Sequence, residues 1–219
     1  MNRRSTLNCL LSAAILCVAV AASAQVQDVI TVGTVNTTGG TVDVPVSIRD
    51  VSGTPLGLDQ PPGSRIQSYS IKVNYSPAAA VQSVTFTRAG ITTALTPTFE
   101  NSPSAAGSIS LLDSFQESTN LIPFTLNGAT PGNQVAHLTF TLAPTVTAGT
   151  TITLTLDPTL TQLTDEGGSA ATKETTTAAN LALVNGAIIV VAQVPALSDF
   201  ALIALCAMLA LIAFMRLRT

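Results

Sequence analysis

The sequence predicts an all-β domain, an antiparallel sandwich of about eight to ten short strands, between two apolar terminal segments. Three observations predict this fold. Segments rich in Thr, Val, Ile and Ser alternate apolar with polar residues along residues 25–193, turn residues recur about every ten positions, and no segment of this range keeps a helical period. The length of the range fits one domain.

The first strands show the alternation most clearly. A strand is expected over residues 26–35 and a second over residues 41–48. The apolar row of the second strand consists of Val42, Val44, Val46 and Ile48. Pro45 stands in the opposite row and lacks an amide donor, so it predicts a sheet edge or a bulge. Residues 51–63 contain three glycines and three prolines and are expected to form a loop.

The later strands follow the same period of two. They are expected over residues 65–75, 80–87, 107–115, 121–126, 134–142, 151–156 and 183–191. The rows expected to face the core are Gln67, Tyr69, Ile71, Val73 and Tyr75; Val81, Val84 and Phe86; Ala136, Leu138, Phe140 and Leu142; and Ile152, Leu154 and Leu156.

The N-terminal segment, residues 1–24, is typical of a secretory signal peptide. Arg3 and Arg4 precede a mostly apolar stretch that ends in small residues, so signal peptidase is expected to cleave between Ala24 and Gln25. The paired arginines leave twin-arginine export as an alternative. A lipoprotein anchored at Cys17 is disfavoured by the bulky residue before it.

The C-terminal segment is expected to contain one transmembrane helix, over about residues 197–215. Residues 200–215 contain neither a charge nor a proline, and Arg216 and Arg218 follow them. Under the positive-inside rule, these arginines flank the anchor in a basic cytoplasmic tail. A buried helix of a soluble domain is the alternative.

The residues before this span resemble a bacterial sorting signal. The stretch reads Val194, Pro195, Ala196, Leu197, Ser198, Asp199 and Phe200. With the apolar span and the arginines, it resembles the IPTL-CTERM signal, a relative of PEP-CTERM. The resemblance implies an exosortase-like sorting enzyme, cleavage near the motif and transfer of the ectodomain to the cell surface. Ala196 and Ala201 depart from the family pattern, which leaves a permanently membrane-anchored product as the alternative.

Composition excludes several kinds of site from residues 25–193. Cys9, Cys17 and Cys206 lie in the terminal segments, so this range has neither a disulfide nor a thiolate metal site. It holds five of the nine basic residues and eleven of the twelve acidic ones, a net charge of −6. No basic patch is available to follow a phosphate backbone, so nucleic-acid binding is not expected. No cofactor is expected either.

Several stretches of this domain resemble a cohesin. They are residues 32–35, 40–48, 69–77, 137–142, 165–168 and 184–190, which keep the order of the family along nearly the whole ectodomain. The resemblance implies a jelly-roll sandwich of about nine strands, of the kind shared with some cellulose-binding modules. It also implies a protein partner on one sheet face, which in the best-known members is a calcium-loaded dockerin.

Candidate chemical residues are few, and each is weighed against a structural role. His137 stands opposite the core row and is expected at the surface, without the nucleophile and orienting acid that a general base needs. Residues 165–168 could hold calcium but more closely resemble a turn. Residues 113–117 could form a ligand edge, although a solvated loop is favoured. Tyr69 and Tyr75 could stack on sugars, but the apolar residues in their row favour the core.

The sequence therefore predicts a non-catalytic protein of the bacterial cell envelope. Its ectodomain, exported to the periplasm or the cell surface, is expected to recognise a protein partner. The alternatives are a carbohydrate-binding module for polysaccharide and a structural surface or matrix protein. A single-pass membrane anchor or transfer to the cell surface holds it in place.

Overall fold

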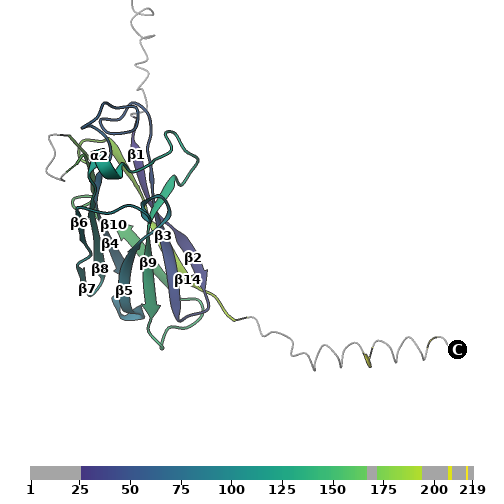
Figure 1. The fold of residues 1–219 in the computed structure, drawn as a ribbon. Coiled ribbons are helices and arrows are strands. Elements are labelled where there is room, and N and C mark those ends of the chain that lie inside the picture. Colours follow the sequence, from purple (N-terminus) through teal and green to yellow (C-terminus); the bar gives the residue numbers. More distant parts are fainter. Residues whose placement is uncertain (1–25, 167–171, 194–206, 209–215, 217–219) are drawn as a thin grey trace, which may run out of the picture.

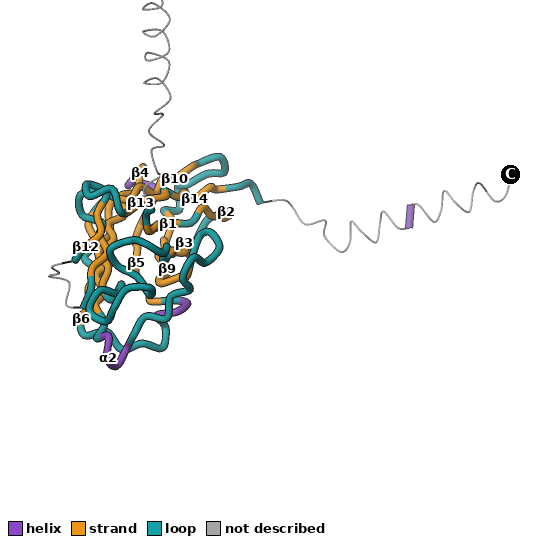
Figure 2. The backbone as a smooth tube through the Cα atoms, turned by 90° about the horizontal axis from the view of Figure 1, so that it is seen from above, coloured by secondary structure: helices purple, strands orange, loops and turns teal. Residues whose placement is uncertain are grey.

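Two β-sheets pack face to face in the computed structural model, which describes residues 26–166, 172–193, 207, 208 and 216 (Figure 1). The smaller sheet has the order β13 (Leu181–Val184), β1 (Asp28–Val32), β3 (Thr41–Arg49), β9 (Asn133–Leu142) and β5 (Val81–Arg88). Figure 2 shows the two layers from above. The all-β sandwich predicted from the alternation is confirmed.

The larger sheet is less regular, because β6, β7 and β8 lie off its main path. Its main path is β12 (Lys173–Thr175), β11 (Gln162–Thr164), β4 (Ser68–Ser76), β10 (Thr151–Leu156), β14 (Gly186–Val190) and β2 (Thr34–Thr37). On the other edge of β4 lies β8 (Ser108–Ser114), which pairs with β6 (Phe99–Asn101) and β7 (Ser104–Ala105). The short helices are η1 (Ala78–Ala80), η2 (Gly90–Thr92) and α2 (Glu117–Asn120).

The first and last expected strands each divide between the two sheets. β1 pairs in parallel with β13 in the smaller sheet, and β2 pairs in parallel with β14 in the larger one. The crossings lie at Gly33 and Asn185, between these strands. A Cβ atom on Gly186 would lie 2.2 Å from the Gly33 carbonyl oxygen, so the two chains approach too closely here for any side chain. The sandwich is antiparallel except for these two pairs.

The alternating rows form one core between the sheets. The rows expected to face inward are buried in β3, β4, β9 and β10, apart from Val42, which is partly buried. Tyr75 packs edge-on against Phe140, with ring centroids 5.6 Å apart. Because the strands and the core in the described part of the chain lie between Asp28 and Val190, this domain is expected to fold without the terminal segments.

The sequence predicted a sheet edge or a bulge at Pro45, and the edge position is wrong. It is paired on β3 with His137 of β9, in the middle of the smaller sheet. Its carbonyl oxygen accepts a hydrogen bond from Gly33, at 2.8 Å. In a strand, the nitrogen and the carbonyl of one residue point to the same side. The proline nitrogen, which has no hydrogen to donate, therefore faces the end of β1 at Val32. The expected bulge does occur, one residue later, between Val46 and Ser47.

The strand expected over residues 121–126 is absent, and this prediction is wrong. Ile122 and Phe124 are buried, which accounts for the apolar pattern. Their segment is held by side chains in place of a neighbouring strand: the Ile122 amide donates to Gln67 Oε1 at 3.3 Å. The Thr125 amide donates to Asn133 Oδ1 at 2.7 Å.

No helix in the described part of the chain is both long enough and apolar enough to cross a membrane. The helix expected over residues 197–215 lies outside the described residues, apart from residues 207 and 208. The signal peptide expected over residues 1–24 lies outside them as well.

Candidate functional site

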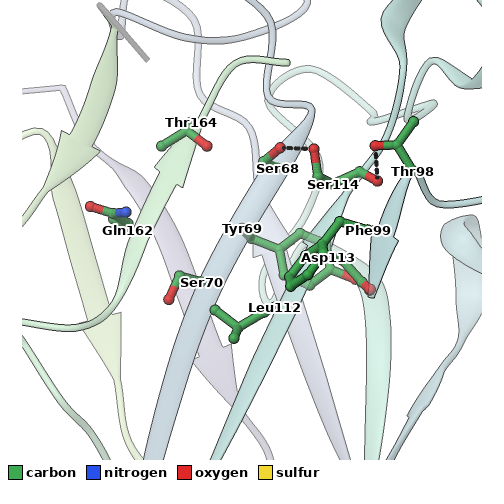
Figure 3. Close-up of a pocket in the computed structure, with 10 residues that line it drawn as sticks. All are labelled: Ser68, Tyr69, Ser70, Thr98, Phe99, Leu112, Asp113, Ser114, Gln162 and Thr164. Carbon is green, nitrogen blue, oxygen red and sulfur yellow. Dashed lines mark hydrogen bonds between the residues drawn. The ribbon is translucent and has the colours of Figure 1, made fainter. Parts of the chain in front are cut away.

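An open cleft of about 490 Å³ lies on the outer face of the larger sheet (Figure 3). Its residues come from neighbouring strands, because Ser70 of β4 is in register with Leu112 of β8 on one side and with Gln162 of β11 on the other. One step along, the matching residues are Ser68, Ser114 and Thr164. Alternation turns these side chains outward, away from the core row of β4.

The hydroxyl groups of the cleft bond mainly to one another and to the backbone. Ser68 Oγ donates to Ser114 Oγ at 2.7 Å, and Thr98 Oγ1 donates to the Ser114 carbonyl at 3.0 Å (Figure 3). Ser70 Oγ donates to the Leu160 carbonyl at 3.0 Å. These bonds hold the hydroxyls in fixed positions, so the floor of the cleft, where Ser68 and Ser114 are buried, is polar and already organised.

Apolar side chains lie at and beside this hydroxyl-lined surface. Phe99 of β6 is 55% exposed, and Leu160, in the loop before β11, is 51% exposed. Leu112 is half-buried between them on β8. Phe99 and Leu112 thus place apolar surface against the hydroxyl groups of the cleft.

Beneath the cleft lies a buried pair, Tyr69 and Asp113. The Tyr69 hydroxyl donates to Asp113 Oδ2 at 2.5 Å, while Asp113 Oδ1 has no hydrogen-bond partner. Burial raises the pKa of Asp113 to about 6, although the hydrogen bond from Tyr69 opposes the shift. Burial and the neighbouring carboxyl raise the pKa of Tyr69 as well. The charge of Glu100 raises the pKa of Asp113, and Arg88, which pairs with Glu100, lowers it.

The fold is similar to that of solved cohesin domains. The third cohesin of ScaC from Acetivibrio cellulolyticus, solved in complex with the ScaB dockerin, superposes with a TM-score of 0.53 at 16% identity over 76% of this chain and 100% of the cohesin. The sandwich has a cohesin-like fold. The expected resemblance is therefore confirmed.

Two further cohesins give the same result. CaCohA2 of Clostridium acetobutylicum, solved in complex with CaDoc0917, is 27% identical, with a TM-score of 0.50 over 75% of this chain and 99% of its own. The OlpA cohesin of Clostridium thermocellum, solved in a type I cohesin–dockerin complex, is 13% identical, with a TM-score of 0.51 over 74% of this chain and 98% of its own. No curated protein sequence matches this chain.

The C-terminal resemblance is also confirmed. Residues 192–219 match the IPTL-CTERM motif. The sorting residues Val194–Phe200 and the cleavage residues Ala24 and Gln25 lie outside the described residues, as does Arg218. Arg216 is described as an exposed helical residue.

Residues 113–117 do not form the solvated loop that the sequence favoured. Asp113 and Phe115 are buried in the cohesin-like sandwich, because β8 continues through Ser114 and carries both inward. Glu117 begins α2, lies 3.4 Å from Arg65 and accepts the Gly63 amide at 2.8 Å. The segment is therefore a structural link between loops.

The other candidates take structural positions. Tyr69 and Tyr75 are buried, as their row predicted. His137 is half-buried on β9 of the smaller sheet, away from the cleft. Glu166 accepts the Glu117 amide at 3.0 Å at the start of α2, which agrees with the turn interpretation of this acidic stretch. Of that stretch, residues 167 and 168 lie outside the described residues.

Sequence reasoning missed a second group of acidic residues. Asp28, Asp50 and Glu174 are wholly buried at the end of the sandwich that carries the loop after β3. They stand far apart in the sequence, in separate strands and loops, so no spacing connects them. That all three side chains are buried becomes visible only in the three-dimensional structure.

Proposed function

We propose that this cohesin-like domain binds a protein partner through the outer face of the larger sheet, around the cleft of β4, β8 and β11. The observation that carries the proposal is the pre-organised hydroxyl surface lined by Phe99 and Leu112, with the exposed Leu160 beside it, whose carbonyl accepts a hydrogen bond from Ser70. Interfaces combine an apolar centre with polar groups that stay hydrogen-bonded, and this face supplies both.

Two further observations support a protein as the partner. The three cohesins compared above were each solved in complex with a dockerin. A row of aromatic rings for sugar stacking is not formed by Tyr69 and Tyr75, because both rings lie in the core. A dockerin-type module is therefore the partner class that we propose. The role is recognition without catalysis.

The terminal segments are proposed to place this domain at the cell surface. The match of residues 192–219 to the IPTL-CTERM motif supports handling by an exosortase-like sorting enzyme after export. Intact mass measurement of the mature protein tests this. A chain that begins at Gln25 and ends near the motif is expected, whereas a chain that still carries residues 200–219 would mean that the segment only anchors the protein.

Binding is tested with the purified domain, residues 26–193, immobilised and exposed to dockerin modules from the same organism with and without calcium. Phe99→Ala and Leu160→Ala are each expected to weaken binding at least about tenfold, as central apolar contacts do. Val184→Ala is the matched control, because this side chain is 45% exposed on β13 of the smaller sheet. Equal binding by all three variants would exclude this face as the binding surface.

A further inference from the structure

The buried acidic residues missed by the sequence lie together where three distant segments meet. Asp28 begins β1, Asp50 follows β3, and Glu174 lies in the middle of β12. All three side chains have no exposed surface. The loop after β3 lies at the upper end of the sandwich in Figure 1, and its backbone amides bond to all three carboxylates. Buried carboxylates are normally paired with a base or bound to a metal.

One oxygen of each carboxylate is held by a backbone amide. The Val51 amide donates to Asp28 Oδ1 at 2.6 Å, and the Leu56 amide donates to Glu174 Oε1 at 2.9 Å. The Leu58 amide donates to Asp50 Oδ2 at 3.0 Å. The chain of the loop is thus wrapped around the three carboxylates and fixes their orientation.

The second oxygen of each carboxylate accepts no hydrogen bond from an amide, a hydroxyl or a base. Asp28 Oδ2, Glu174 Oε2 and Asp50 Oδ1 are all buried without such a donor in the described part of the chain, and the carboxyls of Asp28 and Glu174 lie within hydrogen-bonding reach of each other. A charged oxygen left in this state costs far more than an unpaired neutral group, so a native fold rarely leaves three together. These atoms point to a missing positive group.

Within the described residues, no base is among the charges that act on the three carboxyls. The charges that act most strongly on the three carboxyls are those of one another and of Asp59, and burial with this repulsion raises the pKa of Asp28 and of Asp50. The pKa of Glu174 is raised by burial and by Asp50. A cation or retained protons must therefore balance the group.

Neutral oxygen atoms complete the surroundings of the Asp28 and Glu174 pair. Thr54 Oγ1 lies 3.4 Å from Asp28 Oδ1, 2.9 Å from the Val51 carbonyl oxygen and 2.6 Å from the Leu56 carbonyl oxygen. Carboxylate, hydroxyl and carbonyl oxygens are the ligands of Ca²⁺, whose flexible geometry suits a site built from loop backbone. Mg²⁺ prefers strict octahedral geometry and retained water, which a closed site does not offer.

We propose that Asp28 and Glu174, with oxygen atoms of residues 51–56, bind one Ca²⁺ ion, and that Asp50 adds its charge beside them. Among the described residues, no three acidic, His or Cys side chains already stand in a metal-binding arrangement, so the site takes two carboxylates and completes its shell with neutral oxygens. The ion would join β1, the loop and β12. This inference is independent of the proposed binding face.

Glycine at position 57 agrees with a crowded set of carboxylates. A Cβ atom there would lie 2.6 Å from Asp50 Oδ1 and 3.0 Å from Asp59 Oδ1. Its φ of +148° also favours glycine. Only glycine therefore fits at this position of the loop, where the carboxylates of Asp50 and Asp59 approach the backbone.

The test is calorimetric titration of the chelator-treated domain, residues 26–193, with CaCl₂ and separately with MgCl₂ at neutral pH. Binding of one Ca²⁺ with a Kd of about 1 mM or below is expected, as in extracellular calcium modules, with a higher Tm in calcium than in chelator. Asp28→Asn and Glu174→Gln are each expected to lose both responses, while their Tm in chelator is no lower than that of the wild type.

Asp43→Asn is the matched control, since Asp43 lies on the outer face of β3 and accepts a hydrogen bond from Thr139. It should keep both calcium responses. Absence of calcium binding to the wild-type domain, with equal Tm in calcium and chelator, would overturn the proposal and mean that retained protons balance the carboxylates. The titration of the wild type decides the question even if a variant fails to fold.

Discussion

Asp113 gives the sharpest test of the electrostatics beneath the cleft. Its carboxyl accepts the Tyr69 hydroxyl with one oxygen, and the other oxygen is buried without a partner. Asp113→Asn keeps the shape and an acceptor for Tyr69 but removes the ionisable group. We expect this substitution to reduce the loss of stability that the wild-type domain shows as pH rises from about 4 to 7.

The direction follows from the raised pKa of Asp113. The folded value is about 6 and the unfolded value is 3.8, so the folded chain binds more protons between these values. The contribution of Asp113 to stability is therefore fully present below about pH 4 and is lost as pH rises through about 6. A difference of roughly two pKa units corresponds to about 3 kcal/mol at most, and water entering from the open cleft reduces it to about 1–2 kcal/mol.

The assay is urea unfolding of the domain at several pH values, with the wild type and Asp113→Asn measured side by side in calcium. The quantity of interest is the difference in unfolding free energy between the two proteins, since other buried carboxyls titrate equally in both. Asp113→Asn should gain about 1–2 kcal/mol on the wild type between pH 4 and 7. A difference that stays constant with pH would refute a raised pKa at Asp113.

Two further predictions concern packing. Gly186→Ala should lower the free energy of unfolding by about 3 kcal/mol, because the new methyl group meets the Gly33 carbonyl oxygen. Gly128→Ala is the control in the same urea assay: its nearest neighbour lies at 3.2 Å, and the loss should be less than about 1 kcal/mol. Phe140→Ala, in the core, should lower the free energy of unfolding by about 3–5 kcal/mol, and Phe99→Ala, at the surface, by less than about 0.5 kcal/mol. Similar losses of stability for both variants would contradict the assigned burial.

Much of the sandwich could be predicted from the sequence because one face of each central strand is buried. The rows of β3, β4, β9 and β10 have a period of two, and burial on one side is what produces that period. The same reasoning failed for residues 121–126, whose buried apolar side chains belong to a loop held by Gln67 and Asn133. Alternation of apolar and polar residues indicates which side chains are buried, but it does not indicate which groups form hydrogen bonds with the backbone.

The crossings and the sites were hidden for a different reason. At Gly33 the chain leaves one sheet for the other while its alternation continues, so a single strand was expected. Phe99 stands in a three-residue strand too short to show a pattern. Asp28 and Glu174 come together through the pairing of β1 with β13 and of β12 with β11, and no local rule contains that contact.

The central claim is that a protein partner binds the outer face of the larger sheet. Photo-crosslinking on intact cells tests it most directly, with a photoreactive amino acid placed at Phe99 of β6 or, as the control, at the exposed Thr85 of β5 on the smaller sheet. A discrete protein adduct from position 99 and none from position 85 is the predicted result. A protein adduct from position 85 alone, or only polysaccharide captured at position 99, would contradict it.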